Sequence, residues 1–226
     1  MQKILGAYKI SAMGRKKLLD RDIVIDTALR IYWAKGFEHV SMAELARQTG
    51  YDRAGVYKEF GSEDDLICEV LIRYRETVLL PLYAILGQIN NLEAAMRFVF
   101  DSMIQDSYKN LTKYGIDDMP TPKRTPYARS CLFFGLFSSK KGRVLSQRLQ
   151  RVVKKINREI NQYFEVKVDL AQKKGEVDKS LDPKIAARFL MHQFSLAQVL
   201  RERGEKKSKV EQTANYAMRS LIGSTA

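Results

Sequence analysis

Long apolar runs are absent from this 226-residue sequence, and no stretch approaches the ~20 residues that a membrane span requires. The first 14 residues lack both the long apolar region and the small-residue cleavage site of a signal peptide. Cysteine is scarce: Cys68 and Cys131 stand far apart, without metal-ligand spacing. These absences predict a soluble cytoplasmic protein with reduced core thiols and no membrane partner.

Signs of catalysis are equally scarce. The chain has two histidines, no glycine-rich phosphate loop, no nucleophile elbow and no spacing typical of metal ligands. No pair of carboxylates is singled out from the others. We therefore expect no enzyme activity, no catalytic residue, no metal site and no cofactor.

Charge is abundant but unevenly distributed. The net charge of +13 suggests a polyanionic partner, yet residues 15–75 hold 11 Lys/Arg against 11 Asp/Glu. Most of the excess lies after residue 75. Charge alone therefore does not place a nucleic-acid contact in the N-terminal part, and a motif has to do so.

Strand signals are nearly absent, whereas helical spacing recurs throughout. Ile25, Ala28, Leu29 and Tyr32 follow helical spacing, and Gly36 provides a C-terminal stop. Pro81 is expected to limit or kink the helix that begins after Ser62. The body is expected to contain helices over residues 92–110, 126–138, 142–174, 183–203 and 206–222, separated by an irregular connection over 111–126. The sequence predicts an all-α fold.

The most informative segment runs from Ser41 to Phe60. Ser41 and Glu44 form a capping-box pattern before a short helix, and Gly50 permits a tight turn. Asp52 can then cap a second short helix, on which Val56 and Phe60 face inward. Two short helices joined by such a turn form a helix-turn-helix, although two packed helices of a plain bundle would show the same local pattern. A second helix of this kind fits the major groove of DNA.

From Ile25 to Leu66 the spacing of many positions resembles the N-terminal domain of the tetracycline-repressor (TetR) family. The matching residues are Ile25, Ala28, Leu29, Tyr32, Gly36, Phe37, Val40, Ser41, Met42, Leu45, Ala46, Gly50, Val56, Tyr57, Phe60, Ser62 and Leu66. The resemblance implies a three-helix DNA-binding domain on a larger helical body that dimerises and binds a small-molecule effector. We expect a tail over residues 1–14, the DNA-binding domain over 15–62 and the body over 63–226.

The resemblance also implies residue roles. Tyr57 and Lys58 match positions that commonly contact the DNA backbone, and Ser41 caps the helix before the turn. Arg53, Ala54 and Gly55 match positions that vary with the operator, and we expect Arg53 to contact a base. The function implied is a sequence-specific regulator, a repressor that an effector releases from a palindromic double-stranded operator.

Two residues depart from the family pattern. Glu63 stands where the family usually has a phosphate-contacting lysine, so it is expected to repel DNA. Gly55 replaces a frequent threonine and costs ~1 kcal/mol of helix propensity. The basic arm Arg15, Lys16 and Lys17 can supply the lost charge from the minor groove, or it is a solvated tail.

Two apolar faces on the predicted helix over residues 183–203 indicate burial on both sides. A four-helix interface between two copies would achieve this, as would a large monomeric core. The expected dimer-interface residues on the last two helices are Phe189, Leu196, Leu200, Ala214, Ala217, Met218 and Leu221.

The effector pocket is weakly marked in the sequence. Aromatic, flexible and polar side chains of the body are the candidates for its lining, although most are expected to be core: Phe98, Met103, Tyr108, Cys131, Phe134, His192 and Gln193.

Residues 140–174 hold 11 Lys/Arg against three Asp/Glu. An acidic effector and flanking DNA are alternative partners for these cations, but because the cations spread around the helix, a solvated face is the favoured interpretation. The alternative function is a non-specific nucleic-acid-binding protein that uses this basic body.

Overall fold

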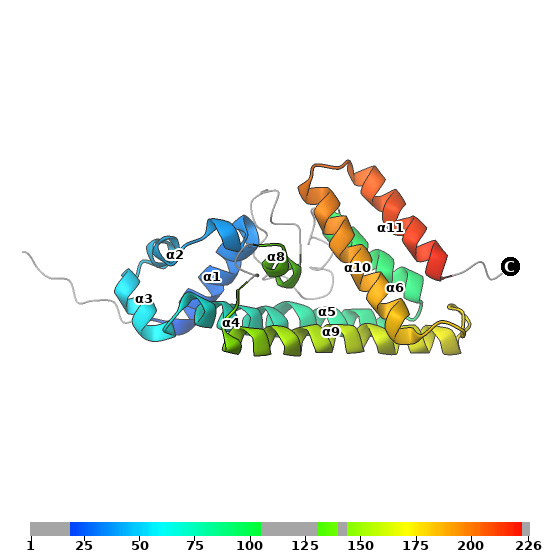
Figure 1. Cartoon of the computed structure of the whole chain (residues 1–226), viewed down its shortest axis with the longest axis horizontal. Helices are drawn as coiled ribbons and strands as arrows, with labels where there is room; N and C mark the ends of the chain where they lie inside the picture. The colour runs from blue at the N-terminus through cyan, green and yellow to red at the C-terminus, as the bar shows by residue number, and fades with distance from the viewer. Residues whose placement is uncertain (1–18, 105–130, 140–143, 223–226) are drawn as a thin grey trace, which may run out of the picture.

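The computed structural model describes residues 19–104, 131–139 and 144–222, and these residues form helices without a β-strand among them. The all-α expectation is confirmed. In the labelling of Figure 1 the elements are α1 (Arg21–Lys35), η1 (Phe37–His39), α2 (Met42–Thr49), α3 (Arg53–Phe60), α4 (Glu63–Tyr74), η2 (Arg75–Leu79), α5 (Leu80–Gln88), α6 (Leu92–Ile104), α8 (Leu132–Ser138), α9 (Gln147–Lys173), α10 (Pro183–Glu202) and α11 (Lys207–Leu221). None of these helices combines the length and apolar character that a bilayer crossing requires.

The expected helix boundaries in the body agree closely with the described ones, with two exceptions. The helix predicted over 126–138 begins at Leu132, because Cys131 before it is not helical. The predicted helix over 142–174 begins later, because Ser146 is its N-cap and accepts a hydrogen bond from the Leu149 amide. The ends of the helices predicted over 92–110 and 126–138, and the connection over 111–126, lie wholly or partly outside the described residues.

Pro81 neither ends nor breaks the helix that contains it. The chain from Glu63 to Gln88 stays helical, but η2 is a π-turn in which the Leu80 amide donates to the Arg75 carbonyl. Proline has no amide hydrogen, and its ring crowds the carbonyl four residues earlier. A wider turn just before the proline accommodates both effects, so the expected stop is replaced by a local change in helix type.

A pair of parallel helices forms the base of the body. The run α4–η2–α5 and the long helix α9 lie side by side along the molecule (Figure 1). Their contacts keep the same direction from end to end: Arg148 binds Asp65 at one end, Arg75 binds Glu159 in the middle, and Lys167 binds the carbonyl of Ile89 at the other. The N-termini of both helices therefore lie together beside α1–α3.

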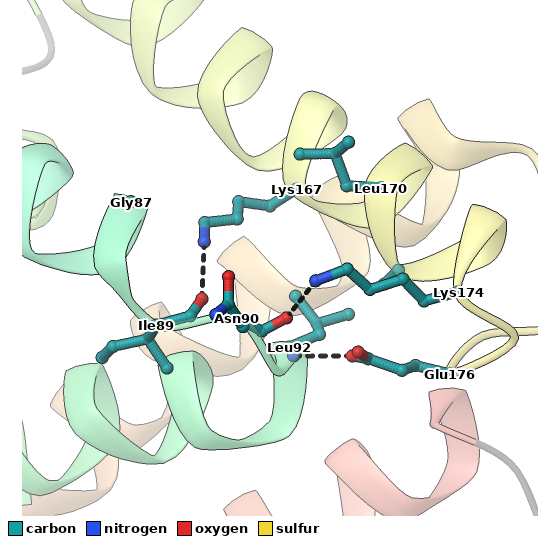
Figure 2. Close-up of a pocket in the computed structure, with 9 residues that line it drawn as sticks. Gly87, Ile89, Asn90, Leu92, Lys167, Leu170, Lys174 and Glu176 are labelled. Atoms are coloured by element: carbon teal, nitrogen blue, oxygen red, sulfur yellow. Dashed lines mark hydrogen bonds between the residues drawn. The ribbon is translucent and has the colours of Figure 1, made fainter.

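The corner between α5 and α6 is fastened to the end of α9, as Figure 2 shows. Lys167 Nζ donates to the carbonyls of Leu86 and Ile89, and Lys174 Nζ donates to Asn90 at 2.7 Å. Glu176 accepts from the first amide of α6, Leu92, at 2.7 Å. These side chains satisfy backbone groups that helix ends leave unpaired. They surround a cavity of about 70 Å³, which is a product of the corner's packing.

Gln172 supports the loop between α9 and α10. Its buried Nε2 donates to the carbonyls of Asp178 and Leu181, both at 2.8 Å.

We predict that Gln172→Leu lowers the free energy of unfolding by about 1–3 kcal/mol, because two part-buried carbonyls lose their donor. Urea unfolding at one protein concentration measures this. The exposed Gln162→Leu serves as the control, and equal midpoints for the two variants would contradict the prediction.

Candidate nucleic-acid interface

The helix-turn-helix is held by a small apolar core. Met42, Leu45 and Ala46 of α2 are buried against α1, and Val56 and Phe60 of α3 point into the same core. This is the arrangement that the spacing predicts. Because the inward residues of α3 are fixed by burial, the helix presents one defined face to solvent.

The turn between α2 and α3 depends on Gly50 and Tyr51. Gly50 adopts φ +73°, a left-handed conformation that favours glycine, and its amide donates to the Ala46 carbonyl. Tyr51 is buried, and its hydroxyl accepts a hydrogen bond from the Asp20 amide at 2.9 Å. Sequence reasoning missed Tyr51, because its partner lies 31 residues earlier in the chain.

The outer face of α3 carries the predicted contact residues. Arg53, Ala54 and Lys58 are exposed, whereas Gly55 and Tyr57 are half-buried. The Arg53 guanidinium lies 5.3 Å from the centre of the Tyr57 ring, so stacking orients it along the helix. A Cβ on Gly55 would lie 3.4 Å from the Asp52 carboxylate, which is ordinary contact. Packing among α1, α2 and α3, which together we call the head, therefore does not require glycine at this position.

The first residues of α2 differ from the expected capping box in one respect. The Ser41 hydroxyl accepts from the Glu44 amide at 3.2 Å, as predicted. The Glu44 carboxylate, however, accepts hydrogen bonds from Lys35, Arg47 and Gln48. The hydrogen bonds from Arg47, Gln48 and Lys35 lower the pKa of Glu44 to about 2. The carboxylate thus joins α1 to α2.

The departure of Glu63 from the family pattern predicts a carboxylate that faces the DNA. In the structure this carboxylate turns toward α1 instead. It accepts a hydrogen bond from the buried Tyr32 hydroxyl at 3.1 Å. Burial and the neighbouring Glu63 raise the pKa of Tyr32 well above its ordinary value, so the phenol remains a donor. The carboxylate of Glu63 is thus directed at Tyr32, a core residue of α1.

The other acidic residues at the start of α4 bind the first residues of α9. Asp64 accepts from the Ser146 amide at 2.6 Å, and Asp65 accepts from Arg148 at 2.7 Å. Glu69 binds both Arg148 and, at 3.2 Å, Arg21 of α1. These carboxylates connect the head to the body rather than lying free at the interface.

The cationic side chains on α3 have no ion-pair partner among the described residues. Glu59 pairs with Arg21 at 2.9 Å, and Asp52 caps α3 through the Gly55 amide at 2.6 Å. Neither Arg53 nor Lys58 makes an ion pair with any described residue. A head with no net charge therefore still presents cations on the face that the sequence assigns to DNA. The predicted arm residues Arg15, Lys16 and Lys17 lie outside the described residues.

The predicted effector residues are dispersed. Phe98, Phe134 and Gln193 are half-buried, while His192 is exposed on α10 and so does not line an interior pocket of this chain. Cys131 is buried and accepts a hydrogen bond from the Tyr74 hydroxyl at 3.2 Å. Tyr108 and the side chain of Met103 lie outside the described residues. Burial raises the pKa of both cysteine thiols, which keeps them protonated.

The predicted dimer residues fall into two groups. Leu196 of α10 is 40% exposed, and Phe189 and Leu200 are half-buried beside it. The residues expected on the last helix are instead buried within this chain, where α11 packs on α10 and α6: Ala214, Ala217, Met218 and Leu221. The apolar stripe of α11 was thus assigned to the wrong surface. The side chains exposed on the outside of this pair include Ile185, 65% exposed, and Tyr216, 80% exposed.

Comparison with known proteins agrees with the geometry of the head. Residues 24–70 match the sequence model of "Bacterial regulatory proteins, tetR family". The HTH-type transcriptional repressor ComR of Escherichia coli is 39% identical over 61 residues, which are 27% of this chain and 29% of ComR. The uncharacterized HTH-type transcriptional regulator YezE of Bacillus subtilis is 22% identical over 119 residues, 53% of this chain and 54% of YezE. The matches thus span less than a third of one relative and about half of the other.

Solved structures agree over most of the chain. A TetR-family regulator from Agrobacterium tumefaciens aligns with a TM-score of 0.71 at 14% identity, covering 90% of this chain and 97% of that one. The reduced form of NemR from E. coli also gives 0.71 at 14% identity, with 91% and 98% covered. CifR, solved with a 26-bp double-strand operator, gives 0.68 at 16% identity, with 92% and 100% covered.

The resemblance drawn from the sequence is therefore confirmed. Residues 24–70 match the family's sequence model, and the described residues share the fold of solved TetR-family regulators. The matched family model is one of bacterial regulatory proteins.

The hydrogen bonds on Glu44 predict an acid titration. The unfolded pKa lies near 4.5 and the folded pKa near 2, so the stabilising contribution is complete above pH 4.5 and is lost as the pH falls toward 2. We predict that carboxyl NMR finds the Glu44 midpoint near 2, and that Arg47→Ala raises it toward 4.5. The remote Arg219→Ala should leave the midpoint in place. A wild-type midpoint near 4.5 would contradict this account.

Proposed function

We propose that the protein is a homodimeric transcriptional repressor that binds a palindromic double-stranded operator and is released by a small-molecule effector in the cytoplasm. The observation that carries the proposal is the outer face of α3, where Arg53, Ala54 and Lys58 are exposed on a helix fixed by Val56 and Phe60. A helix of this kind fits the major groove. The name of ComR, a repressor, and the operator complex of CifR support the same function.

In this proposal residues 15–62 form the DNA-binding domain, residues 63–226 form the effector-binding and dimerisation domain, and residues 1–14 are a tail. Arg53 contacts a base edge, with its guanidinium oriented by Tyr57. Lys58 and Tyr57 contact phosphate, and Ser41, as N-cap, presents the start of α2 to the backbone. Ala54 and Gly55 allow close approach to the groove, and the arm Arg15, Lys16 and Lys17 enters the adjacent minor groove.

The proposed dimer interface is the outward face of α10 with the outer side of α11. Ile185, Phe189, Leu196 and Leu200 follow helical spacing on α10, and two of them are substantially exposed in the single chain. Tyr216 of α11 extends this surface. Pairing across a two-fold axis would bury these side chains in a four-helix bundle and place two α3 helices about 34 Å apart.

The proposed effector site lies in the helical body, where Cys131, Phe134 and Phe98 supply apolar surface. An effector acts only through its different affinity for the DNA-bound and the released arrangement. In this proposal a conformational change at such a site is transmitted to α3 through α4. Ion pairs of Glu69 join α4 to α1 and to α9.

Substitutions on α3 separate base recognition from phosphate contact. We predict that Arg53→Ala relaxes the preference at one base pair by ~1–3 kcal/mol in random-oligonucleotide selection. Lys58→Gln should weaken binding to all sequences and reduce the slope of log K against log salt by about 1. Lys179→Gln, an exposed change far from the head, is the control. A selected-site pattern unchanged by Arg53→Ala would show that this residue does not recognise a base.

An aspartate on the exposed face of α10 should dissociate the dimer. We predict that Leu196→Asp and Ile185→Asp give monomers in sedimentation velocity and lose operator affinity, because a charge cannot be buried unpaired in an apolar interface. Val166→Asp is the matched control, since Val166 is 53% exposed on α9, away from that face. Dimers that persist in both α10 variants would place the interface elsewhere.

A further inference from the structure

Four cations of α9 form one stripe on its solvent face. Arg151, Lys154, Lys155 and Arg158 are all exposed and follow the i, i+3, i+4, i+7 spacing of a single helix face. The opposite face is apolar and buried through Leu149, Val153, Ile156 and Ile160. The cations therefore do not circle the helix, as their distribution in the sequence suggested. We call these four residues the basic stripe.

The span of α9 that carries the basic stripe contains no exposed carboxylate. Between Gln147 and Gln162 the exposed residues of α9 are only Lys, Arg, Gln and Asn. Glu159, the one acidic residue in that span, is half-buried and binds Arg75. No residue of the basic stripe makes an ion pair with a described residue, whereas Arg148, one turn earlier, is held by Asp65 and Glu69.

The side chains on this face are better suited to binding a polyanion than to contact with water alone. Solvated helix faces usually interleave both signs of charge, as on the exposed Asp169–Lys173 pair further along α9. Here cations are interleaved with amides, which donate to phosphate oxygens without adding negative charge. The stripe is ~10 Å long, enough to face about three successive phosphates of one DNA strand.

The position of the basic stripe identifies the polyanion. The N-terminus of α9 is fixed to the first turn of α4 through the bond from the Ser146 amide to Asp64, directly after the helix-turn-helix. The stripe thus begins at the end of the body next to the head (Figure 1). It lies on the solvent-exposed face of α9, opposite the buried face of that helix, and none of its four residues belongs to the proposed dimer interface on α10 and α11. Duplex DNA held by the head is the polyanion nearest to this face.

We propose that the basic stripe of α9 is a second DNA-contact surface, which binds the sugar-phosphate backbone of duplex flanking the operator without recognising its sequence. The inference rests on the proposed DNA-binding function. It gives the body a sequence-independent role in affinity beside the sequence-specific role of α3. Flanking duplex must curve toward the body to reach the stripe, which makes affinity depend on duplex length.

The test compares two duplexes, one ending at the selected operator and one extended by ~20 random base pairs on each side. The variant Arg151→Gln/Lys154→Gln/Lys155→Gln/Arg158→Gln should match the wild-type protein on the short duplex. On the extended duplex it should lose roughly tenfold or more in affinity, and its salt slope should fall by about 3 for each stripe that contacts the duplex. Glutamine preserves helix propensity, so circular dichroism and the melting temperature should not change.

The matched control removes four exposed lysines that lie outside α9: Lys179→Gln/Lys184→Gln/Lys206→Gln/Lys209→Gln. It changes net charge equally and should bind both duplexes like the wild-type protein. An equal loss in the control, or no loss specific to the extended duplex, overturns the inference. If the wild-type protein selects no operator at all, the proposed function fails instead, and a random duplex then tests the stripe alone by the same comparison.

Discussion

Glu69 accepts charge-assisted hydrogen bonds from Arg148 of α9 and pairs with Arg21 of α1, and this shared carboxylate joins the head to the body. Asp64 and Asp65 add bonds to the Ser146 amide and to Arg148, and Arg73 binds Asp22 and Asp26 of α1. An isolated surface ion pair contributes little, but a network of partly shielded pairs fixes relative position. The position of α4 therefore depends on its ion pairs with α1 and α9. The orientation of α3 depends in turn on α4, on which it packs.

The same network explains how a head without net charge can face DNA. Its carboxylates are engaged with internal donors: Glu44 with Arg47, Glu59 with Arg21, and Glu63 with Tyr32. Arg53 and Lys58 have no such counter-charge among the described residues and project from α3. The field at the surface is set by which charges are paired, and a count over residues 15–75 does not show this. The basic stripe of α9 follows the same principle on the body.

The elements of the fold could be predicted because their determinants are local. Ser41, Asp52 and Ser62 cap the amides three residues ahead, and the positions of Val56 and Phe60 follow from helical periodicity. Side-chain direction could not be predicted where the partner is distant in sequence, as for Glu63 with Tyr32. The apolar stripe of α11 was visible, but its burial against α6 and α10 depends on packing between segments far apart in the chain.

The central claim is that two copies of α3 occupy successive major grooves on one face of a duplex. An iron chelate attached at Ala43→Cys, an exposed position of α2 outside the proposed contact residues, tests it directly, since the native Cys68 and Cys131 are buried and resist labelling. Cleavage of the selected operator should fall in two clusters, related by two-fold symmetry and about 10 base pairs apart. Cleavage spread evenly along the duplex, or confined to one cluster, would contradict the account.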